Sequence, residues 1–372
     1  MELYEKVYVK PSFLETEHGQ IGCEDCHGGD PSDPDWKTAH EGLIKDPTDT
    51  DPEAVCGECH EAIVASAGQS LHVTLAPIYG AVAQRAGGAD KAAGTLAQAC
   101  KRHCGTCHAS CGQCHVSRPD YVQGGFLAKH HFIKPAMDTT CASCHGGRVH
   151  SEYTGARDDF EADVHYESEE MTCMDCHDGS QMHAATPGGV DRFDMPQRPD
   201  CRNCHQNAVS ETTENRSHRL HRNRVACQVC HAQAGKSCFS CHVGTDAKGL
   251  PYFKCKKTEP FFKIGHNPRK TKDRPYAFVV LRHPPTVPDT FKYYTKKPLA
   301  QFDALPTWKL DTPHSILRIT ARNKTCNNCH GNAALFLSDT DLEKWEHRAN
   351  ADVVVPADEI PKPVDDAQNP KP

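Results

Sequence analysis

One short pattern, Cys-x-x-Cys-His, dominates the sequence and occurs ten times in 372 residues. It uses twenty of the 22 cysteines and ten of the 25 histidines. A chain of this composition would hold only about 0.09 such motifs by chance, so ten copies require a common chemical cause. Numbered along the chain, motifs 1 to 10 are Cys23-Cys26-His27, Cys56-Cys59-His60, Cys104-Cys107-His108, Cys111-Cys114-His115, Cys141-Cys144-His145, Cys173-Cys176-His177, Cys201-Cys204-His205, Cys227-Cys230-His231, Cys238-Cys241-His242 and Cys326-Cys329-His330.

This pattern is the attachment signature of c-type haem: two thiols add to the vinyl groups of the porphyrin, and the histidine ligates the iron from one face. We therefore predict ten covalent haems c. Structural zinc usually pairs a CxxC with a distant second half and gains nothing from a histidine that always follows at once. A disulfide scaffold leaves the histidines unexplained, and a thioredoxin-like redox pair needs one or two motifs rather than ten.

The aliphatic content of the chain is too low for an ordinary core. Leu, Ile, Val and Phe make up 61 residues, about 16 %, whereas chains below roughly 20 % tend to be disordered when charged. We therefore expect the haems to replace a conventional core and the haem-free chain not to fold. The predicted fold class is mostly loops with short α-helices wrapped around a covalent haem array, with little β structure. No apolar run approaches the roughly 18 residues of a membrane span, so no transmembrane segment is expected.

The second axial ligand of each iron is predicted to be histidine. Methionine is the usual rival, and the chain has only six. Two histidines per iron imply low reduction potentials and no open position for a substrate. The ten favoured second ligands are His18, His40, His72, His130, His165, His183, His218, His221, His283 and His314. The weaker candidates are His103, His131, His150, His266 and His347.

The motif spacing and local patterns predict the organisation of the chain. We expect an acidic lobe with four haems (1–130), a central lobe with five (131–245), a basic lobe with one (246–350) and a Pro-rich extended tail (351–372). The segments that join motif 3 to motif 4, and motif 8 to motif 9, are so short that the two haems of each pair must nearly touch. Cys100 and Cys255 lie outside the motifs and are expected to form a disulfide with each other, to stay free or, in the case of Cys100, to lie beside the haem pair of motifs 3 and 4.

Hydrophobic periodicity and end signals predict only a few regular elements. Helices are expected over 51–68, over 71–100 with a break near Gly87 and Gly88, and over 339–350 with Ser338 as the cap. A strand is expected over 276–282.

Charge is unevenly distributed along the chain. The net charge is −7, yet residues 1–60 carry −11 and residues 243–325 carry +11. The basic stretch either neutralises haem propionates or docks onto an acidic surface, in a redox partner or in the next copy of the chain. Nucleic acid is not an expected partner, because aromatic residues are sparse and the net charge is negative.

With these motifs the chain resembles the multihaem c-type cytochromes of anaerobic bacteria and archaea that respire metals or exchange electrons with other cells. The stretch HGQIGCEDCHGGD, residues 18–30, looks like the Gly-rich haem segments of octahaem tetrathionate reductases. The resemblance implies haem attachment outside the cytoplasm, closely spaced haems and electron transfer. Some relatives stack into extracellular filaments in which a histidine of one subunit ligates a haem of the next. The reductases carry one haem with lysine in place of the motif histidine, or an open iron, whereas all ten motifs here end in histidine.

We therefore expect an extracellular or periplasmic electron-transfer protein, with redox proteins or extracellular electron acceptors as partners and with self-assembly into a filament as an extension. The alternative is a multihaem oxidoreductase that reduces a small oxoanion or nitrogen compound, such as tetrathionate, nitrite or hydroxylamine, at one open haem. A third option is a periplasmic shuttle subunit of a membrane complex. No export leader is visible at Met1, which fits a numbering that starts after leader removal.

Overall fold

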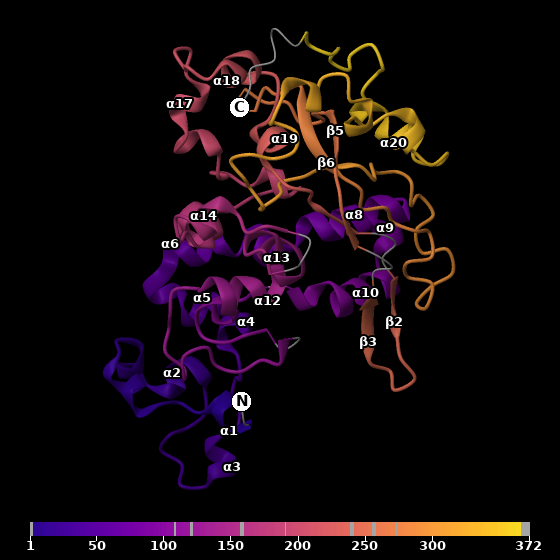
Figure 1. Ribbon diagram of the computed structural model, residues 1–372. Coiled ribbons are helices and arrows are strands. Elements are labelled where there is room, and N and C mark those ends of the chain that lie inside the picture. Colours follow the sequence, from indigo (N-terminus) through magenta and orange to yellow (C-terminus); the bar gives the residue numbers. More distant parts are fainter. Residues whose placement is uncertain are drawn as a thin grey trace. The chain divides into compact units, whose positions relative to one another are not determined.

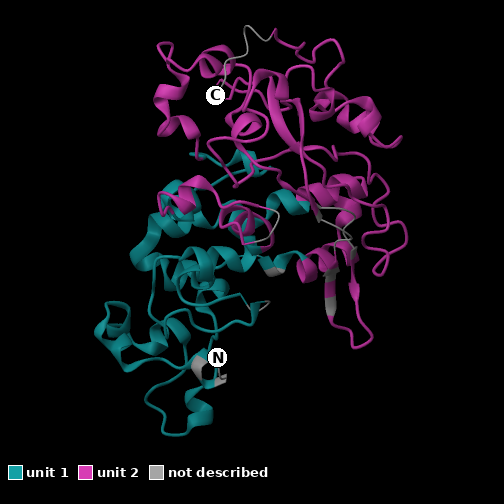
Figure 2. Ribbon diagram, in the orientation of Figure 1, with its two compact units in different colours: residues 1–79, 104–146, 172–198 teal, residues 80–103, 147–171, 199–372 magenta. Residues whose placement is uncertain are grey.

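The computed structural model describes residues 3–107, 109–119, 122–156, 160–189, 191–238, 242–254, 258–272 and 274–365. The expected fold class is confirmed in its backbone: the chain is mostly loops joined by short helices, with little β structure (Figure 1). It divides into two compact units whose segments alternate along the sequence (Figure 2). Unit 1 comprises residues 1–79, 104–146 and 172–198, and unit 2 comprises residues 80–103, 147–171 and 199–372. The boundary expected between the first two lobes, at residues 130 and 131, lies inside unit 1, and each unit contains residues from before and after it.

Unit 1 is built almost entirely from helices of about one turn. Helices this short are not stable alone in water, so tertiary contacts must hold them. Its helices are α1 (Leu3–Val7), α2 (Cys23–His27), α3 (Trp36–Ala39), α4 (Pro47–Thr50), α5 (Pro52–Val55), α6 (Gly57–Ala67), α7 (Leu71–Thr74), α11 (Cys111–His115), α12 (Ala142–His145), α15 (Cys173–Cys176) and α16 (Gly179–Met182). Helix α8 (Ala76–Ala86) carries the chain from unit 1 into unit 2.

Unit 2 combines short helices with three small antiparallel sheets. Its helices are α9 (Ala89–Ala92), α10 (Thr95–His103), α13 (Ser151–Tyr153), α14 (Val164–Glu167), α17 (Gln206–Val209), α18 (Arg216–His221), α19 (Cys227–His231) and α20 (His347–Asn350). Strand β1 (Lys236–Cys238) pairs with β4 (Thr258–Pro260), and β2 (His242–Thr245) pairs with β3 (Pro251–Lys254). The third sheet has the order β5 (Lys263–His266), β6 (Phe278–Arg282) and β7 (Lys309–Leu310).

A conventional hydrophobic core lies around this third sheet. Ile264, Val280, Leu281 and Leu337 are each at most 1 % exposed. Gly265 allows the close packing, because a Cβ at this position would lie 2.2 Å from Leu281 Cδ1. The expectation that the chain lacks an ordinary core is therefore wrong for unit 2. Among the described residues of unit 1, by contrast, the buried apolar side chains are few and come from separate stretches of the chain: Phe13, Val64, Leu71, Leu75, Val116 and Met137.

A buried carboxylate is built into the edge of the unit 2 core. Glu346 is 1 % exposed and accepts hydrogen bonds from His283 Nε2 at 2.7 Å and from Thr307 Oγ1 at 2.5 Å. Its second oxygen accepts the backbone N–H of Glu343 at 3.0 Å. The His283 ring stacks on Trp308 with a centroid distance of 4.6 Å. This cluster ties three separate segments of unit 2 together.

Most of the expected elements are present, with different ends. Helices α5 and α6 occupy the stretch predicted over 51–68. The stretch 71–100 breaks near Gly87 and Gly88 as predicted, and it also breaks at Leu75, whose φ is +49°. The strand begins at Phe278 rather than Tyr276.

The helix predicted over 339–350 is wrong as a continuous element. Ser338 does cap a turn, but the turn is a 3₁₀ helix that ends at Asp341, and α20 starts only at His347. The backbone leaves the helical path at Leu342, whose φ of −97° and ψ of +136° are extended.

The C-terminal segment also differs from the expected free arm. Val353 and Val355 are each 2 % exposed and pack in the unit 2 core. Farther along, the Gly331 N–H donates to Pro361 O at 2.6 Å. The segment is therefore not a free arm: the valines hold its start in the core, and hydrogen bonds between Asn327 and Val364 hold it farther on, while residues 356–359 between them are exposed. Among the described residues, none of the helices has the length and apolarity needed to cross a bilayer.

Candidate haem sites

Most of the Cys-x-x-Cys-His motifs lie on short helical turns, whereas motif 9 begins at the end of β1 and ends at the start of β2. In α2, α11 and α19 the whole motif is helical, and in motif 10 the turn is a 3₁₀ helix (Cys326–Asn328). On such a turn, residues at positions i, i+3 and i+4 face the same side. The two thiols and the imidazole of a motif can therefore reach one planar group together.

Second histidines lie beside the motif histidines. Four such pairs occur in unit 1, with these ring-centroid distances: His27 with His130 at 5.9 Å, His60 with His18 at 6.2 Å, His115 with His183 at 6.1 Å and His145 with His72 at 6.4 Å. Three occur in unit 2: His205 with His165 at 5.9 Å, His231 with His218 at 5.9 Å and His330 with His221 at 6.1 Å. Seven of the ten favoured second ligands are thus placed next to a motif histidine of their own unit.

The spacing of these pairs fits a single iron between the two rings. Two imidazoles that bind one metal from opposite sides, at about 2.0–2.1 Å each, have ring centroids about 6.3 Å apart. The seven distances lie between 5.9 and 6.4 Å. A zinc ion would instead need four converging ligands. Within the described part of the chain, no group of three His, Cys, Asp or Glu side chains converges in that way.

Hydrogen bonds at Nδ1 orient many of these rings. A carbonyl oxygen can only accept, so the Nδ1 atom facing it carries the proton and Nε2 keeps a lone pair for a metal. The backbone contacts are His27 to Ile44 O at 2.8 Å, His115 to Ile133 O at 2.8 Å, His231 to Leu317 O at 3.1 Å, His330 to Lys362 O at 3.1 Å and His221 to Ser217 O at 2.8 Å.

The protonation state of the second ligands also suits metal binding. Burial lowers the pKa of four of them, His72, His130, His183 and His218. The neutral imidazole is the form that binds a metal. His165 is the exception, because a hydrogen bond to Asp163 raises the pKa of its ring.

Three of the favoured second ligands have other surroundings. His40 is exposed, with Nδ1 2.5 Å from Trp36 O. The backbone N–H of His314 donates to the buried Glu152 at 3.3 Å. His283 engages Glu346 through Nε2, the nitrogen that an iron would take, so it fits a structural role better than the ligand role expected from the sequence.

Three of the five weaker candidates use Nε2 for protein contacts. His103 Nε2 lies 2.6 Å from Tyr294 Oη, His131 Nε2 lies 3.1 Å from Ser12 Oγ, and His266 Nε2 lies 3.1 Å from Glu359. His347 Nδ1 lies 3.6 Å from Asp339. The use of Nε2 thus separates His103, His131 and His266 from the paired histidines, whereas it does not separate His347.

Cysteines of different motifs adjoin in unit 1. Burial raises the pKa of Cys56 to about 11, and the nearby thiols of Cys111 and Cys26 add to the rise. Likewise, burial raises the pKa of Cys114 to about 11, with the Cys141 thiol as the next cause. A hydrogen bond with Cys141 raises the pKa of Cys173. These contacts place five of the six motifs of unit 1 in the order 1, 2, 4, 5, 6, and motif 3 is not among them.

A second series of thiol contacts occurs in unit 2. A hydrogen bond between Cys201 and Cys227 raises the pKa of the first thiol and lowers that of the second. Burial raises the pKa of Cys230 to about 11, and the thiol of Cys329 adds to it. The order is therefore motif 7, motif 8, motif 10. Motif 10 joins this series although it is the most distant motif in sequence, with its start 88 residues after that of motif 9.

An open cavity adjoins motif 7. It has a volume of about 540 Å³ and is lined by Cys204 and His205 of the motif, by Gln206 and by His218, the partner of His231. A cavity that exposes the cysteine and histidine of one motif beside the second histidine of another is the kind of space that a flat macrocycle could fill.

Motifs 3, 6 and 9 are not among the seven with a paired second histidine. His108, Cys241 and the side chains of Cys238 and His242 are outside the described residues. His177 of motif 6 is described, and its Nδ1 lies 2.8 Å from Oε1 of the buried Gln181. Cys100 is buried in α10, which lies against β3, but its candidate partner Cys255 is also outside the described residues.

Sequence reasoning missed the polar groups that hold the imidazoles. Gln181 orients His177, and Asp163 orients His165 at 2.8 Å. For Asp163 a local signal exists, since it stands two residues before a candidate ligand and caps α14. The backbone carbonyls carry no such signal. No family model, curated protein or solved structure matches the chain.

Proposed function

We propose that the protein transfers electrons along ten covalent haems c, each held between two histidines where the chain provides a pair. The single observation that carries the proposal is the set of seven motif histidines, each with a second imidazole 5.9–6.4 Å away. Haem supplies one-electron redox chemistry when bound. The paired cysteines anchor it, the motif histidines bind one face of the iron, and the second histidines bind the other.

The same residues favour an electron carrier over an enzyme. Two protein ligands leave an iron without an open position, so an iron held by such a pair can exchange electrons but cannot bind a substrate. The adjoining thiols support close spacing, because a thioether fixes the edge of a macrocycle to its cysteine. The order 1, 2, 4, 5, 6 in unit 1 and the order 7, 8, 10 in unit 2 then describe two series of neighbouring carriers.

Removal of one second ligand should open one iron. In His183→Gly, the iron at motif 4 keeps His115, which Ile133 O still orients, but it loses its other ligand. We expect about one tenth of the iron to become high-spin and to bind carbon monoxide when reduced. Electron paramagnetic resonance and optical spectroscopy measure both.

The matched control for this variant is His266→Gly. It removes another histidine outside the motifs, one that contacts Glu359. It should leave all iron low-spin. A low-spin His183→Gly protein, or equal effects of the two variants, would contradict the assigned ligand pair. In the wild-type protein, a high-spin signal that shifts with nitrite, hydroxylamine or tetrathionate would favour the reductase instead.

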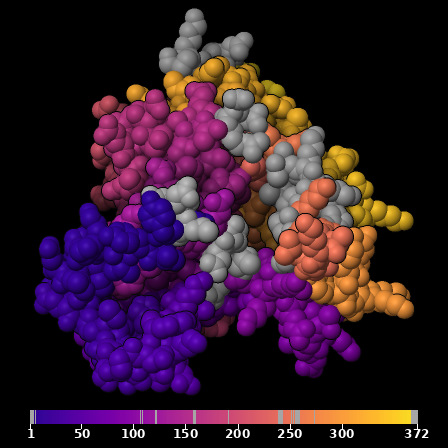
Figure 3. Space-filling model, turned by 90° about the horizontal axis from the view of Figure 1, so that it is seen from below, coloured from indigo at the N-terminus to yellow at the C-terminus, as the bar shows by residue number. Residues whose placement is uncertain are grey.

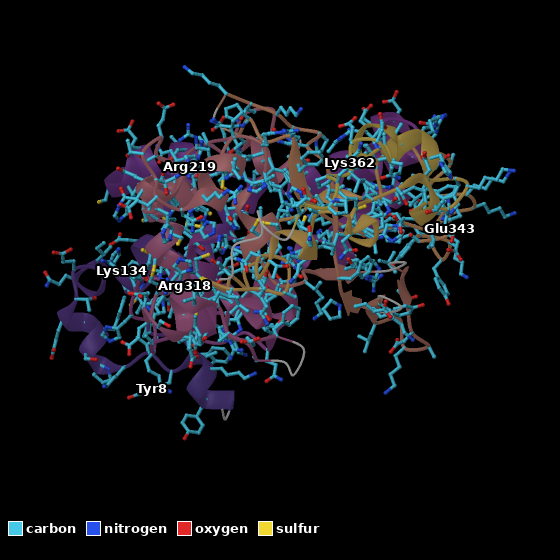
Figure 4. The ribbon with its side chains drawn as sticks, turned by 45° about the horizontal axis from the view of Figure 1, so that its top comes forward. Tyr8, Lys134, Arg219, Arg318, Glu343 and Lys362 are labelled. Carbon is cyan, nitrogen blue, oxygen red and sulfur yellow. The ribbon has the colours of Figure 1, made fainter. Side chains whose placement is uncertain are left out.

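Self-assembly through the N-terminal segment is a second proposal within this function. Eight of the fifteen large apolar side chains exposed in the described chain fall within residues 4–43, among them Tyr4, Leu14 and Trp36. The segment forms a broad face of unit 1 (Figure 3), and the Tyr8 ring points outward (Figure 4). Such a concentration of exposed apolar side chains in one segment favours an interface there. The net charge of −11 over residues 1–60 complements the +11 of residues 243–325 in another copy.

Assembly should therefore grow with protein concentration and weaken with salt. Trp36→Ala removes a side chain that is 69 % exposed and should reduce assembly, whereas Ile63→Ala, at an exposed position outside the segment, should not. Sedimentation and electron micrographs at low and high concentration measure this. Monomers under all conditions would rule out the filament but not electron transfer.

A further inference from the structure

His165 differs from the other oriented histidines in the charge of its hydrogen-bond acceptor. Its Nδ1 lies 2.8 Å from Oδ1 of Asp163, whereas the acceptors named above for His27, His115 and His231 are neutral backbone carbonyls. Its ring faces His205 of motif 7 at a centroid distance of 5.9 Å. A negative charge is thus applied directly to one candidate axial ligand.

Asp163 is held rigidly in place by three N–H donors. Oδ1 accepts the His165 backbone N–H at 2.8 Å as well as the ring contact, and Oδ2 accepts the Ile316 N–H at 2.7 Å. The residue is 2 % exposed, and its own N–H donates to Tyr153 O at 2.9 Å. An ionised carboxylate is acceptor-only, so this set of donors suits the charged form. A fixed buried charge acts strongly because little water screens it.

We propose that Asp163 is a positioning residue that lowers the reduction potential of the haem at motif 7 below that of the haem at motif 8. The inference rests on the proposed function. A carboxylate that accepts from the ligating imidazole makes the ligand more electron-donating and adds negative charge near the iron, and both effects favour the oxidised iron.

The neighbouring site provides the comparison. His231 of motif 8 donates Nδ1–H to Leu317 O, the residue after Ile316, so one short segment orients both sites. Cys201 and Cys227 share a hydrogen bond, which makes motifs 7 and 8 neighbours. Two adjacent carriers therefore differ in the charge behind one imidazole. At partial reduction, the electron should reside on the motif 8 side.

The test is a redox titration of the full holoprotein with Asp163→Asn. The variant removes the charge but retains an oxygen that can accept from Nδ1. We expect the affinity of one haem for an electron to rise at least tenfold, which is about 59 mV for a one-electron couple. Asp163→Glu retains the charge and should restore most of the wild-type potential.

A reversed variant tests the same principle at motif 6. Gln181→Glu places a carboxylate opposite Nδ1 of His177. In the wild-type protein the acceptor there is the neutral amide oxygen of Gln181, 2.8 Å away. The potential of a different haem should fall. A rise with Asp163→Asn and a fall with Gln181→Glu support the inference, and unchanged potentials in both variants overturn it.

A second measurement does not depend on the folding of the Asp163 variants. His165→Met keeps the attachment motif and replaces only the second ligand, so it should move a low-potential component of the wild-type titration upward. If the component that moves starts above that of a matched His218→Met variant at motif 8, the inference is wrong. Intact mass separates this result from failure of the proposed function, because that function requires ten haems in every variant, whichever potentials move.

Discussion

Without attached haem, unit 1 is expected to lose its structure while the core of unit 2 persists. Most helices of unit 1 that carry motifs span only four or five residues, and the longest, α6, has eleven, so all fall below the roughly 12–15 that an isolated helix needs. Its buried apolar side chains, such as Phe13 and Met137, are scattered. The haems therefore have to supply most of its apolar contacts. Unit 2 has its own cluster around Leu281 and Leu337.

Hydrogen exchange of the chain with all twenty motif cysteines changed to alanine measures this difference. Amides of α2, α11 and α15 should exchange at nearly unfolded rates, while those of β5 and β6 stay more protected. The holoprotein should protect both sets. If the haem-free chain protects α2 and α11 as well as the holoprotein does, haem is not the core of unit 1.

Replacement of Glu346 by glutamine should destabilise unit 2 by about 1–3 kcal/mol, the usual cost of leaving a buried hydrogen-bonding group without its partner. Glutamine keeps one oxygen for His283 and Thr307 but turns an amide group toward the Glu343 N–H, so two donors face each other. Denaturant unfolding at neutral pH measures the loss. Glu343→Gln is the matched control, since that side chain is exposed at the periphery of the molecule (Figure 4) and the change should stay within about 0.5 kcal/mol.

The effect of Glu346 should depend on pH with a definite sign. Burial alone would raise the pKa of Glu346, but the hydrogen bonds from His283, Thr307 and the Glu343 N–H outweigh it and hold the pKa below its ordinary value. The stabilisation is then fully present above about pH 4.3 and is lost as pH falls through the lower folded pKa. The stability gap between wild type and Glu346→Gln should shrink in acid. A gap that widens as pH falls would contradict this assignment.

The candidate ligands could be predicted from the sequence, but their pairing could not. The motif fixes the anchors and the first ligand locally, within one turn. The second ligand comes from anywhere in the fold: His330 meets His221 of α18, and His60 meets His18. Which histidines pair also depends on the nitrogen that the protein engages, as His283 with Glu346 illustrates. Such contacts are tertiary and leave no sequence signal.

The fold was predictable where local signals dominate and not where tertiary packing decides. Gly87 and Gly88 ended a helix as expected, because the break is a backbone property. The average apolar content concealed the unit 2 core, since its residues are concentrated in a few segments such as 278–281 and 353–355. The prolines after residue 355 suggested a free tail, yet the valines before them are buried.

The central claim is that porphyrins are covalently bound to the motif cysteines and held between paired histidines. Intact mass under denaturing conditions, combined with a low-temperature electron paramagnetic resonance spectrum of the same sample, tests it most directly. We expect the polypeptide plus ten haems and a spectrum of low-spin iron. A mass equal to that of the polypeptide alone in a well-folded sample, or predominantly high-spin iron, would contradict it.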